Sequence, residues 1–271
     1  MLRPRIIPCL LVHNGGLVKT VEFKNPKYVG DPINAVKIFN EKEADELVVL
    51  DIDATANGVE PDYRMIANLA AECRMPLCYG GGLRTPEQAK KIISLGVEKV
   101  AISAAAVEDA SLVSRTAEAV GRQSVVVVLD IRKKKGMFAK GYELLTHNAS
   151  KVCKADPFEL ARKLQDTGAG EIVINSIDHD GQMKGYDLEL CTKMRAELRI
   201  PMSFLGGAGS HRDIETLLSA CGVVGASVGS FFVFKGHYKA VLINYPTPVQ
   251  KDAICRVGLA GYQKKSLDVQ R

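Results

Sequence analysis

Eight short runs of apolar residues recur along the chain, and most of them are rich in Val and Ile. The runs are continuous instead of alternating with polar residues, which is typical of strands covered on both faces in a parallel sheet. Segments with helical spacing separate most of them, so the pattern predicts a (β/α)8 TIM barrel. The runs are Ile6–Val12, Leu47–Ile52, Pro76–Tyr79, Val100–Ser103, Val125–Ile131, Ile172–Ile177, Pro201–Leu205 and Gly222–Ser227.

Three of the segments between the runs carry clear signals for a helix. Pro32–Lys42 has apolar residues at helical spacing, and Pro86–Leu95 follows Thr85, a good N-cap before a proline. Pro157–Thr167 repeats this arrangement with Asp156 as its cap. An open, doubly wound sheet is the weaker alternative, because no GxGxxG turn follows the first run.

The second half of the chain repeats the plan of the first. Residues 31–103 match residues 156–227, and several matching pairs lie 125 positions apart. A repeat of this length within one predicted barrel indicates two half-barrels related by an internal two-fold. The matching pairs include Asp31 with Asp156, Glu46 with Glu171, Pro76 with Pro201, and Gly81 with Gly206.

Composition and charge indicate which classes of partner and cofactor to expect. The chain has 271 residues and a net charge of +5, and its basic residues do not gather on one predicted face, so we expect no nucleic-acid partner. The densest basic run, Arg132–Lys135, is predicted to lie in a solvated loop. The seven cysteines are scattered without a CxxC pair, which is typical of free thiols in a reducing cytoplasm. We expect neither a metal ion nor a cofactor.

The sequence predicts one domain over residues 1–271. The apolar part of the N-terminus is too short for a signal peptide, and no run of about 18 apolar residues predicts a membrane span. Two longer loops are expected, Asn14–Gly30 as a lid over the active face and Arg132–Ala155 as a polar connection. Residues 235–271 are expected to pack on the outside of the barrel, with a frayed end.

Two glycine turns follow predicted strands at the barrel face where such enzymes place their chemistry. Gly80–Gly82 follows the third run, and Gly206–Gly207 follows the seventh. Glycine lets backbone N–H groups approach an anion, and a helix that starts after Ser103 or Ser227 would add a favourable dipole. The pair predicts a ligand with a phosphate at each end. The structural alternative, in which the glycines only turn the chain, stays open.

Aspartates end several of the predicted strands. Asp130 ends the fifth run, Asp51 and Asp53 end the second, and Asp178 and Asp180 follow the sixth. A carboxylate in a barrel mouth is costly unless it is hydrated or hydrogen bonded, so its presence indicates function. We favour a functional role for Asp130 and loop capping for Asp53 and Asp178.

The repeat also aligns the first run with the fifth. Leu11 then occupies the position that Asp130 holds in the second half. Two facing carboxylates would serve general acid/base catalysis, but an aliphatic side chain cannot move a proton. The sequence therefore retains one member of such a pair.

Four charged residues stand immediately before predicted strands, at the opposite mouth of the barrel. Two are basic and two are acidic, so they can close a ring of salt bridges around the barrel axis. Spacing alone favours a structural plug at the floor. The four are Arg5, Glu46, Lys99 and Glu171.

From Met1 to about Phe234 the chain resembles the HisF family, the cyclase subunit of imidazole glycerol phosphate synthase. The resemblance rests on RIIPCL, GLVK, GDP, DELVVLDI, GGGLRT, EKVAIS with AAV, VVVLD, GAGEIVINSIDHDG with GYD, and GGAG. It implies a (β/α)8 barrel that binds a HisH glutaminase subunit at its N-terminal face. Ammonia released by the glutaminase would pass through the barrel to the opposite mouth.

The resemblance implies roles for individual residues. The four charged floor residues correspond to the ammonia gate of the family, which replaces the interpretation of a plain plug. Lys19 corresponds to a lysine of the lid and Asp130 to one catalytic aspartate, while Asp51 and Asp180 correspond to acids around them. The phosphate sites correspond to Gly81, Gly82 and Ser103, and to Gly206, Gly207, Ala226 and Ser227, although Ser103-Ala104 replaces the usual Asn-Thr.

Leu11 stands where the family has its other catalytic aspartate. Loss of a general acid or base typically costs about 10²–10⁴-fold in rate, so ring closure is not expected. With Leu11, the segment LVKTVEFKNPKYVGDPINAVKIFNEKEADELV resembles a HisF-like branch encoded with surface-polysaccharide genes, a HisH-like glutaminase and a sugar amidotransferase. That branch implies delivery of ammonia for converting a sugar N-acetyl group into an acetamidino group.

Two other functions stay open. One is a working cyclase of histidine biosynthesis, in which Asp51 or a water replaces the missing acid. It would convert a phosphoribosyl precursor and ammonia into imidazole glycerol phosphate and an aminoimidazole carboxamide ribotide. The other is an interaction protein that only activates the glutaminase.

Overall fold

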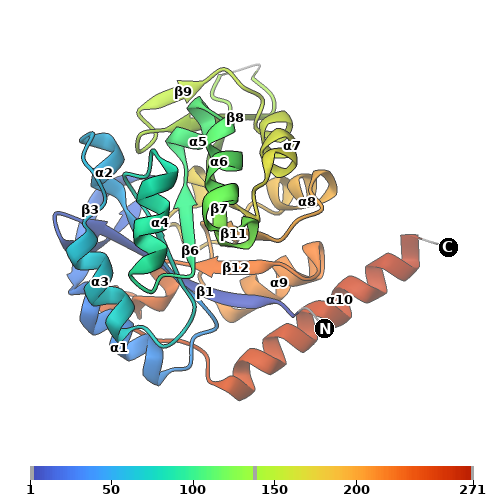
Figure 1. Cartoon of the computed structure of the whole chain (residues 1–271). Coiled ribbons are helices and arrows are strands. Elements are labelled where there is room, and N and C mark those ends of the chain that lie inside the picture. Colours follow the sequence, from blue (N-terminus) through green and yellow to red (C-terminus); the bar gives the residue numbers. More distant parts are fainter. Residues whose placement is uncertain (1–2, 137–138, 270–271) are drawn as a thin grey trace.

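The computed structural model describes residues 3–136 and 139–269. Eight parallel strands close into a barrel, because β1 pairs with β4 and β12, and β7 pairs with β6 and β10 (Figure 1). This closure confirms the predicted TIM barrel and excludes the open sheet. The barrel strands are β1 (Arg5–His13), β4 (Leu47–Asp51), β5 (Leu77–Gly80), β6 (Lys99–Ile102), β7 (Val125–Lys133), β10 (Glu171–Ser176), β11 (Met202–Leu205) and β12 (Gly225–Val228).

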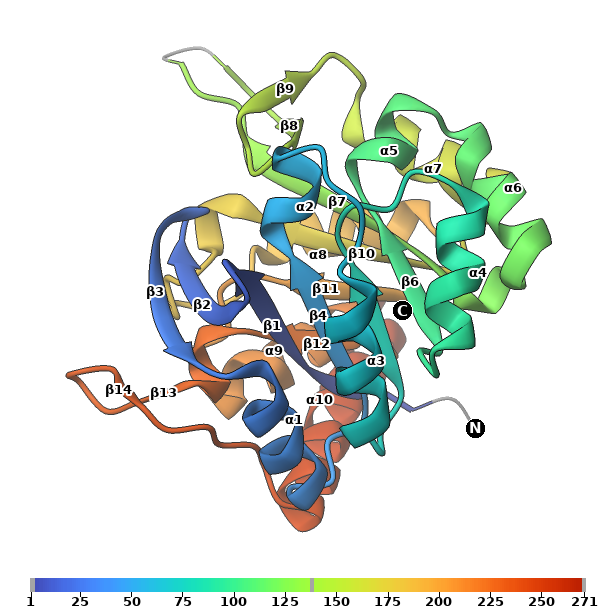
Figure 2. The same ribbon diagram turned by 60° about the vertical axis from the view of Figure 1, so that its left-hand side comes forward.

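Helices surround the barrel (Figures 1 and 2). The longer ones are α1 (Pro32–Glu41), α3 (Tyr63–Glu72), α4 (Pro86–Ser94), α6 (Ser111–Val120), α7 (Pro157–Thr167), α8 (Leu188–Glu197), α9 (His211–Cys221) and α10 (Pro248–Val269). Short helical turns follow several strands: α2 (Ile52–Ala56), α5 (Ala104–Glu108), η1 (Arg122–Ser124), η2 (Ile177–His179) and η3 (Ser230–Phe232). No helix within the described ranges combines the length and the apolar character that crossing a bilayer requires.

The internal repeat is visible in the way the helices begin. A side-chain oxygen accepts an N–H group of the first turn at matching positions of the two halves, which stabilises the helix start. The same spacing of 125 residues separates the members of each pair, so each half-barrel uses one set of capping positions. The pairs are Asp31 and Asp156 before α1 and α7, Asp62 and Asp187 before α3 and α8, and Thr85 and Ser210 before α4 and α9.

The barrel strands separate two apolar layers. Because neighbouring side chains of a strand point to opposite faces, one set packs against the helices and the other fills the barrel interior. The outer layer is the larger and includes Ile6 and Leu10. The inner layer consists of small and medium-sized side chains: Ile7, Cys9, Val48, Cys78, Ala101, Val126, Val128, Val173 and Leu205.

The two loops expected above the barrel contain antiparallel hairpins. The first holds β2 (Gly16–Val21) and β3 (Lys24–Gly30), and the second holds β8 (Tyr142–Thr146) and β9 (Lys151–Cys153). The prediction of loops was wrong in this respect, because β1 and β7 extend beyond the barrel and offer edges for pairing. Figure 2 shows one hairpin at the end of each of these two strands.

The C-terminal part has two contrasting segments. The short hairpin of β13 (Phe234–Lys235) and β14 (Ala240–Val241) is exposed throughout residues 235–242. Helix α10 does pack, against α9 (Figure 1). The approach is close, since a Cβ atom added at Gly258 would lie 2.5 Å from the Cβ atom of Leu218.

Candidate functional site

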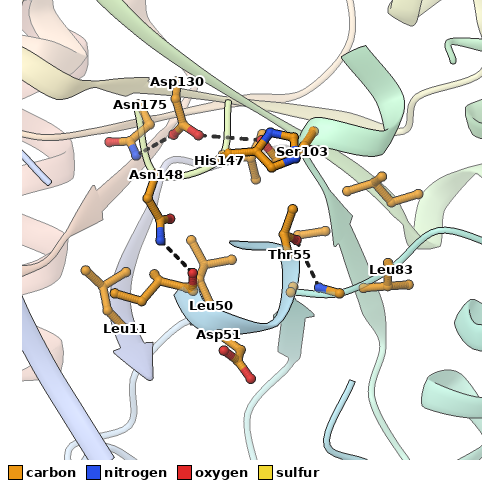
Figure 3. Close-up of a pocket in the computed structure, with 18 of the residues that line it drawn as sticks. Leu11, Leu50, Asp51, Thr55, Leu83, Ser103, Asp130, His147, Asn148 and Asn175 are labelled. Atoms are coloured by element: carbon orange, nitrogen blue, oxygen red, sulfur yellow. Dashed lines mark hydrogen bonds between the residues drawn. The ribbon is translucent and has the colours of Figure 1, made fainter. Parts of the chain in front are cut away.

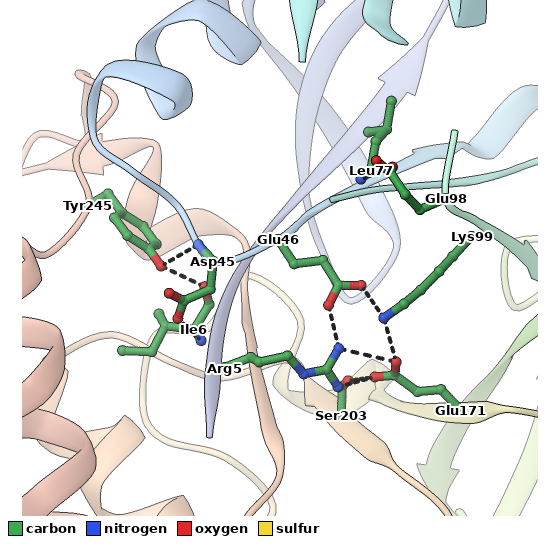
Figure 4. A network of polar contacts seen from close by, with 10 residues as sticks. All are labelled: Arg5, Ile6, Asp45, Glu46, Leu77, Glu98, Lys99, Glu171, Ser203 and Tyr245. Atoms are coloured by element: carbon green, nitrogen blue, oxygen red, sulfur yellow. Dashed lines mark hydrogen bonds and ion pairs between the residues drawn. The ribbon is translucent and has the colours of Figure 1, made fainter. Parts of the chain in front are cut away.

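The four charged residues expected at the barrel floor form one closed ring (Figure 4). Arg5 donates to Glu46 and, at 2.6 and 3.2 Å, to the two carboxylate oxygens of Glu171. Lys99 donates to Glu46 at 2.7 Å and to Glu171 at 2.9 Å. Positive and negative charges thus alternate around the axis, and each carboxylate is bound by both cations.

Both carboxylates of the ring are buried, with 4% of Glu46 and 5% of Glu171 exposed. Burial by itself would raise the pKa of Glu171, but the hydrogen bond and charge of Arg5, aided by Lys99 and Ser203, lower this pKa to about 2. Ser203 on β11 donates its hydroxyl proton to Glu171. Nothing in the sequence predicts this contact, because a single serine in an apolar strand gives no signal of its partner.

A second polar network lies beside the ring and joins it to the C-terminal part of the chain (Figure 4). Asp45, which precedes Glu46, accepts from the ammonium group of Lys251 at 2.8 Å and from the backbone N–H of Ile6 at 3.0 Å. The hydroxyl of Tyr245 donates to the carbonyl of Ile6 at 2.7 Å. The segment that leads into α10 therefore holds the starts of the two strands that carry Arg5 and Glu46.

The opposite mouth encloses a cavity of about 380 Å³ (Figure 3). Asp130 lies in it and accepts from the side-chain amide of Asn175 at 2.8 Å and from the hydroxyl of Ser103 at 3.5 Å. Burial raises the pKa of Asp130 to about 6, although these two hydrogen bonds oppose the rise. A carboxyl group that titrates near neutral pH is suited to donate or accept a proton.

Leu11 occupies the position of Asp130 in the first half-barrel, and the strand register agrees with this alignment. Leu11 pairs with Leu50 across β1 and β4, while Asp130 pairs with Asn175 across β7 and β10. Both leucines line the cavity and pack against the inner apolar layer. A hydrogen-bonded polar pair on one side of the mouth thus corresponds to two aliphatic side chains on the other.

Three further strand-end aspartates bind backbone N–H groups. One carboxylate oxygen of Asp51 accepts from two N–H groups at the start of α2, and burial raises its pKa. Asp53 accepts from the backbone N–H of Asn14 at 2.6 Å, and Asp178 makes the matching contact with Lys133 at 2.7 Å. Loop capping, as expected for Asp53 and Asp178, accounts for both; Asp51 also lines the cavity.

The β2–β3 hairpin lies across the mouth and places Lys19 inside it. Only 5% of Lys19 is exposed, its ammonium group donates to the carbonyl of Cys9 at 2.5 Å, and burial lowers its pKa. Asp180 holds the hairpin, because its carboxylate accepts from the Thr20 hydroxyl at 2.6 Å and from the backbone N–H of Phe23 at 3.1 Å. Burial raises the pKa of Asp180.

The first glycine turn forms part of the cavity wall. Gly81 and Gly82 have φ angles of +127° and +73°, and a Cβ atom at Gly81 would lie 2.5 Å from the carbonyl oxygen of Asp51. These glycines are therefore required by the backbone itself. The N–H of Gly82 donates to Thr55 at 3.2 Å, while Ser103 lies in the same cavity at the start of α5.

The second glycine turn borders a much smaller cavity, of about 20 Å³. Gly206, Gly207 and Ser227 line it, and the Ser227 hydroxyl is buried without a hydrogen-bond partner among the described residues. An unsatisfied buried hydroxyl is costly, so it favours a polar ligand at this position. The side chain of Ala226 instead packs in the outer apolar layer, so only its backbone is available to the turn.

A turn that was not predicted from the sequence reaches into the mouth. His147 and Asn148 connect β8 with β9, line the cavity, and have φ angles of +53° and +52° (Figure 3). The side-chain amide of Asn148 donates to the carbonyl of Ile52 at 2.7 Å and so connects the two halves. Polar residues in a long loop are ordinary in a sequence, and nothing there indicates which way the turn faces.

The two ends of the barrel differ in their chemistry. The floor ring separates the apolar interior from the outside, while the mouth offers one carboxyl group with a near-neutral pKa and one buried amine. In the parts of the chain that the structure describes, no three His, Cys, Asp or Glu side chains are grouped so as to hold a metal ion.

Comparison with known proteins identifies relatives along most of the chain. The family model described as "Histidine biosynthesis protein" matches residues 5–239. The chain is 55% identical to "Putative imidazole glycerol phosphate synthase subunit hisF3" of Vibrio vulnificus, over 93% of this chain and 96% of that protein. It is 39% identical to "Imidazole glycerol phosphate synthase subunit HisF" of Dehalococcoides mccartyi, over 84% of this chain and 90% of that protein. The chain therefore belongs to the histidine biosynthesis protein family and, within it, to the HisF family.

Proposed function

We propose that this chain is a HisF-type subunit that receives ammonia from a HisH-like glutaminase at its floor and releases it at its mouth. The ammonia serves to amidate a sugar of a surface polysaccharide, through a third protein, instead of closing an imidazole ring. The observation that carries the proposal is the pair Leu11 and Leu50 in the place of an acid and its partner, above a complete ring of charges.

The interior between the ring and the mouth suits a neutral molecule. Its side chains are Val, Ala, Cys, Ile and Leu, so an ammonium ion would lose its hydration there without compensation, whereas neutral ammonia would lose little. The floor ring would close such a path, and the single ammonium group of Lys99 makes two of its contacts. Displacement of this one side chain would open the ring on one side.

The mouth supports the second part of the proposal. Ring closure by two facing acids needs a proton-transfer group on each side, and at the positions equivalent to Asp130 and Asn175 the first half supplies the hydrocarbon of Leu11 and Leu50. Asp51, the substitute considered from the sequence, uses one carboxylate oxygen as a helix cap. A protein that only passes ammonia onward does not need the missing acid.

The pattern of relatives also favours a role apart from the ordinary cyclase. The relatives at 51–55% identity have qualified names, and two of these names are numbered hisF3 and hisF2. Relatives named HisF without qualification are 38–39% identical, and one relative with a qualified, numbered name, hisF2 of Campylobacter jejuni, is 38% identical. We infer from the numbered names that HisF-type proteins can occur beside the ordinary cyclase, and such a protein is free to take another acceptor for ammonia.

A direct assay separates this proposal from histidine biosynthesis. The purified protein, given an ammonium salt and the phosphoribosyl precursor of imidazole glycerol phosphate, should turn over little or none of it. A reference HisF with both catalytic aspartates provides the turnover rate for comparison. Turnover comparable with that reference would refute the proposal and support the cyclase alternative, which is favoured by the near-neutral pKa of Asp130.

The ring provides a test of the conduit. In the complex with its glutaminase, Lys99→Met should uncouple glutamine hydrolysis from amination of the acceptor, so that free ammonia accumulates. Lys193→Met is a matched control, because Lys193 pairs with Glu189 on the exposed face of α8, far from the axis. Unchanged coupling in the Lys99 variant would count heavily against the conduit.

The remaining alternative, an interaction protein that only activates the glutaminase, makes a different prediction for the interior. Ala101 belongs to the inner apolar layer and is 3% exposed. Ala101→Leu should narrow the interior and reduce amination while glutamine hydrolysis continues. Unchanged amination in a correctly folded variant would favour activation without conduction.

A further inference from the structure

Two hairpins that are far apart in the sequence form one exposed surface, which we call the hairpin patch. It consists of residues 24–28 of β3 and residues 235–242 of the β13–β14 hairpin, all of them exposed. The ammonium group of Lys27 joins them, since it lies 3.4 Å from the carbonyl oxygen of Lys239 and 5.0 Å from the ring centroid of Phe234. Figure 2 shows β13–β14 projecting from the barrel on the same side as β3.

The hairpin patch is basic and contains no carboxylate. Residues 24–30 and 234–243 include no Asp or Glu, and the two acids that flank β3 are already engaged. Glu22 accepts from Gln182, and Asp31 caps α1. Within the described residues no ion pair neutralises the lysines of the patch, which are Lys24, Lys27, Lys235 and Lys239.

Large apolar and aromatic side chains stand among these lysines. Tyr28 is 66% exposed and Tyr238 is 93% exposed, at the tip of the second hairpin. Val241 and Leu242 are 46% and 51% exposed. A cluster of exposed apolar side chains beside unneutralised charges is typical of a surface that binds a partner or a membrane.

We propose that the hairpin patch binds the surface of an anionic lipid bilayer. Lysines near such a surface are attracted by the acidic headgroups, tyrosines favour the boundary between headgroups and hydrocarbon, and one or two aliphatic side chains can enter it. A protein partner is the weaker match, because protein interfaces are enriched in Arg and depleted in Lys, and the patch has four lysines and no arginine. This inference is independent of the function proposed above.

Co-sedimentation with vesicles tests the proposal on the full chain. Vesicles that mix phosphatidylglycerol with phosphatidylcholine should bind the protein, pure phosphatidylcholine vesicles should not, and added salt should weaken binding. Lys235→Glu combined with Lys239→Glu should reduce partitioning by roughly tenfold or more. Tyr238→Ser combined with Leu242→Ser should also reduce it, without changing the net charge.

The control reverses the same number of charges elsewhere. Lys134 and Lys135 are exposed between β7 and β8, and Lys134→Glu with Lys135→Glu changes the net charge equally. Thermal unfolding should be similar for all variants, because every altered side chain is exposed. Failure of the unaltered protein to bind anionic vesicles, or equal losses in the patch and control variants, would overturn the proposal; the first result would leave a protein partner as the occupant.

Discussion

Leu11 and Asp130 occupy equivalent positions of the two half-barrels, and their neighbours differ in the same way. Asp130 is hydrogen bonded to Asn175 and Ser103, whereas Leu11 lies against Leu50. The two halves therefore differ at both members of this pair of positions. At the scale of single residues, the first half offers neither an acid nor an amide at these two positions, which is expected if that side of the mouth transfers no proton.

Restoring the acid should restore chemistry if the rest of the mouth remains able to bind the precursor. Leu11→Asp is expected to raise turnover of the histidine precursor, by about 10²-fold or more, because it supplies a proton-transfer group at the missing position. The assay is the ammonium-dependent reaction described above. Leu11→Asn is the matched control, since it adds polarity without a titratable proton, and equal gains in both variants would show that proton transfer is not the cause.

The pKa of Asp130 predicts a pH-dependent stability. Its folded-state pKa is about 6 against an ordinary value of 3.8, so the ionised group destabilises the fold at higher pH. Asp130→Asn should be neutral below about pH 4 and should stabilise the protein by on the order of 3 kcal/mol well above pH 6. Urea unfolding across this range measures the difference, and a constant difference would contradict the raised pKa.

At the scale of elements, each hairpin above the barrel is tied to the opposite half. The β2–β3 hairpin of the first half is bound by Asp180, and the β8–β9 turn of the second half is bound to Ile52 through Asn148. The two hairpins thus cross the mouth in opposite directions. Their contacts determine which residues face the cavity, Lys19 on one side and His147 on the other.

Removing the anchor of the first hairpin should loosen it without unfolding the barrel. Asp180→Ala deletes the acceptor for the Phe23 N–H, and a lost hydrogen bond to a charged group costs roughly 1.5–3 kcal/mol. Amide hydrogen exchange at Phe23 should accelerate by about tenfold or more. Asp178→Ala removes the acceptor for the Lys133 N–H near the second hairpin. It should accelerate amide hydrogen exchange at Lys133 and leave exchange at Phe23 unchanged.

At the scale of the whole molecule, the ring is a stabilising feature as well as a candidate gate. Glu171 has its pKa lowered from 4.5 to about 2, so its ionised form stabilises the fold above pH 4.5, and this contribution disappears as the pH falls through 2. Glu171→Gln should cost on the order of 3 kcal/mol at neutral pH. Urea unfolding should show the two proteins converging in acid, and a gap that persists there would contradict this assignment.

We propose that the C-terminal segment belongs to the same folding unit as the barrel, as expected for one domain. Lys251 and Tyr245 hold the starts of β1 and β4 through Asp45 and Ile6. Lys251→Met should therefore lower the midpoint of thermal unfolding for the entire chain. Two probes should report the same midpoint: the loss of helical circular dichroism, and the labelling of the buried Cys78 thiol as detected by mass spectrometry. Different midpoints would indicate that the barrel and the C-terminal segment unfold as two separate units.

Much of this protein follows from its sequence because the relevant signals are local. The eight apolar runs correspond to the eight barrel strands within a few residues, and the capping residues Thr85 and Asp156 begin the predicted helices. The ring was predictable because charged residues at the starts of neighbouring barrel strands lie close to the axis, where each needs a partner of opposite charge. The hairpins were missed because their pairing depends on strand edges that exist only in the closed barrel.

The barrel, its two-fold repeat and the presence of Leu11 at the position equivalent to Asp130 follow from the sequence alone, since these are properties of spacing along one chain. The tertiary structure determines which side chains far apart in the sequence come into contact. It placed Ser203 on Glu171, turned His147 into the cavity, raised the pKa of Asp130 and assembled the hairpin patch. Each of these depends on contacts or burial between residues far apart in the chain, and no local pattern encodes such distances.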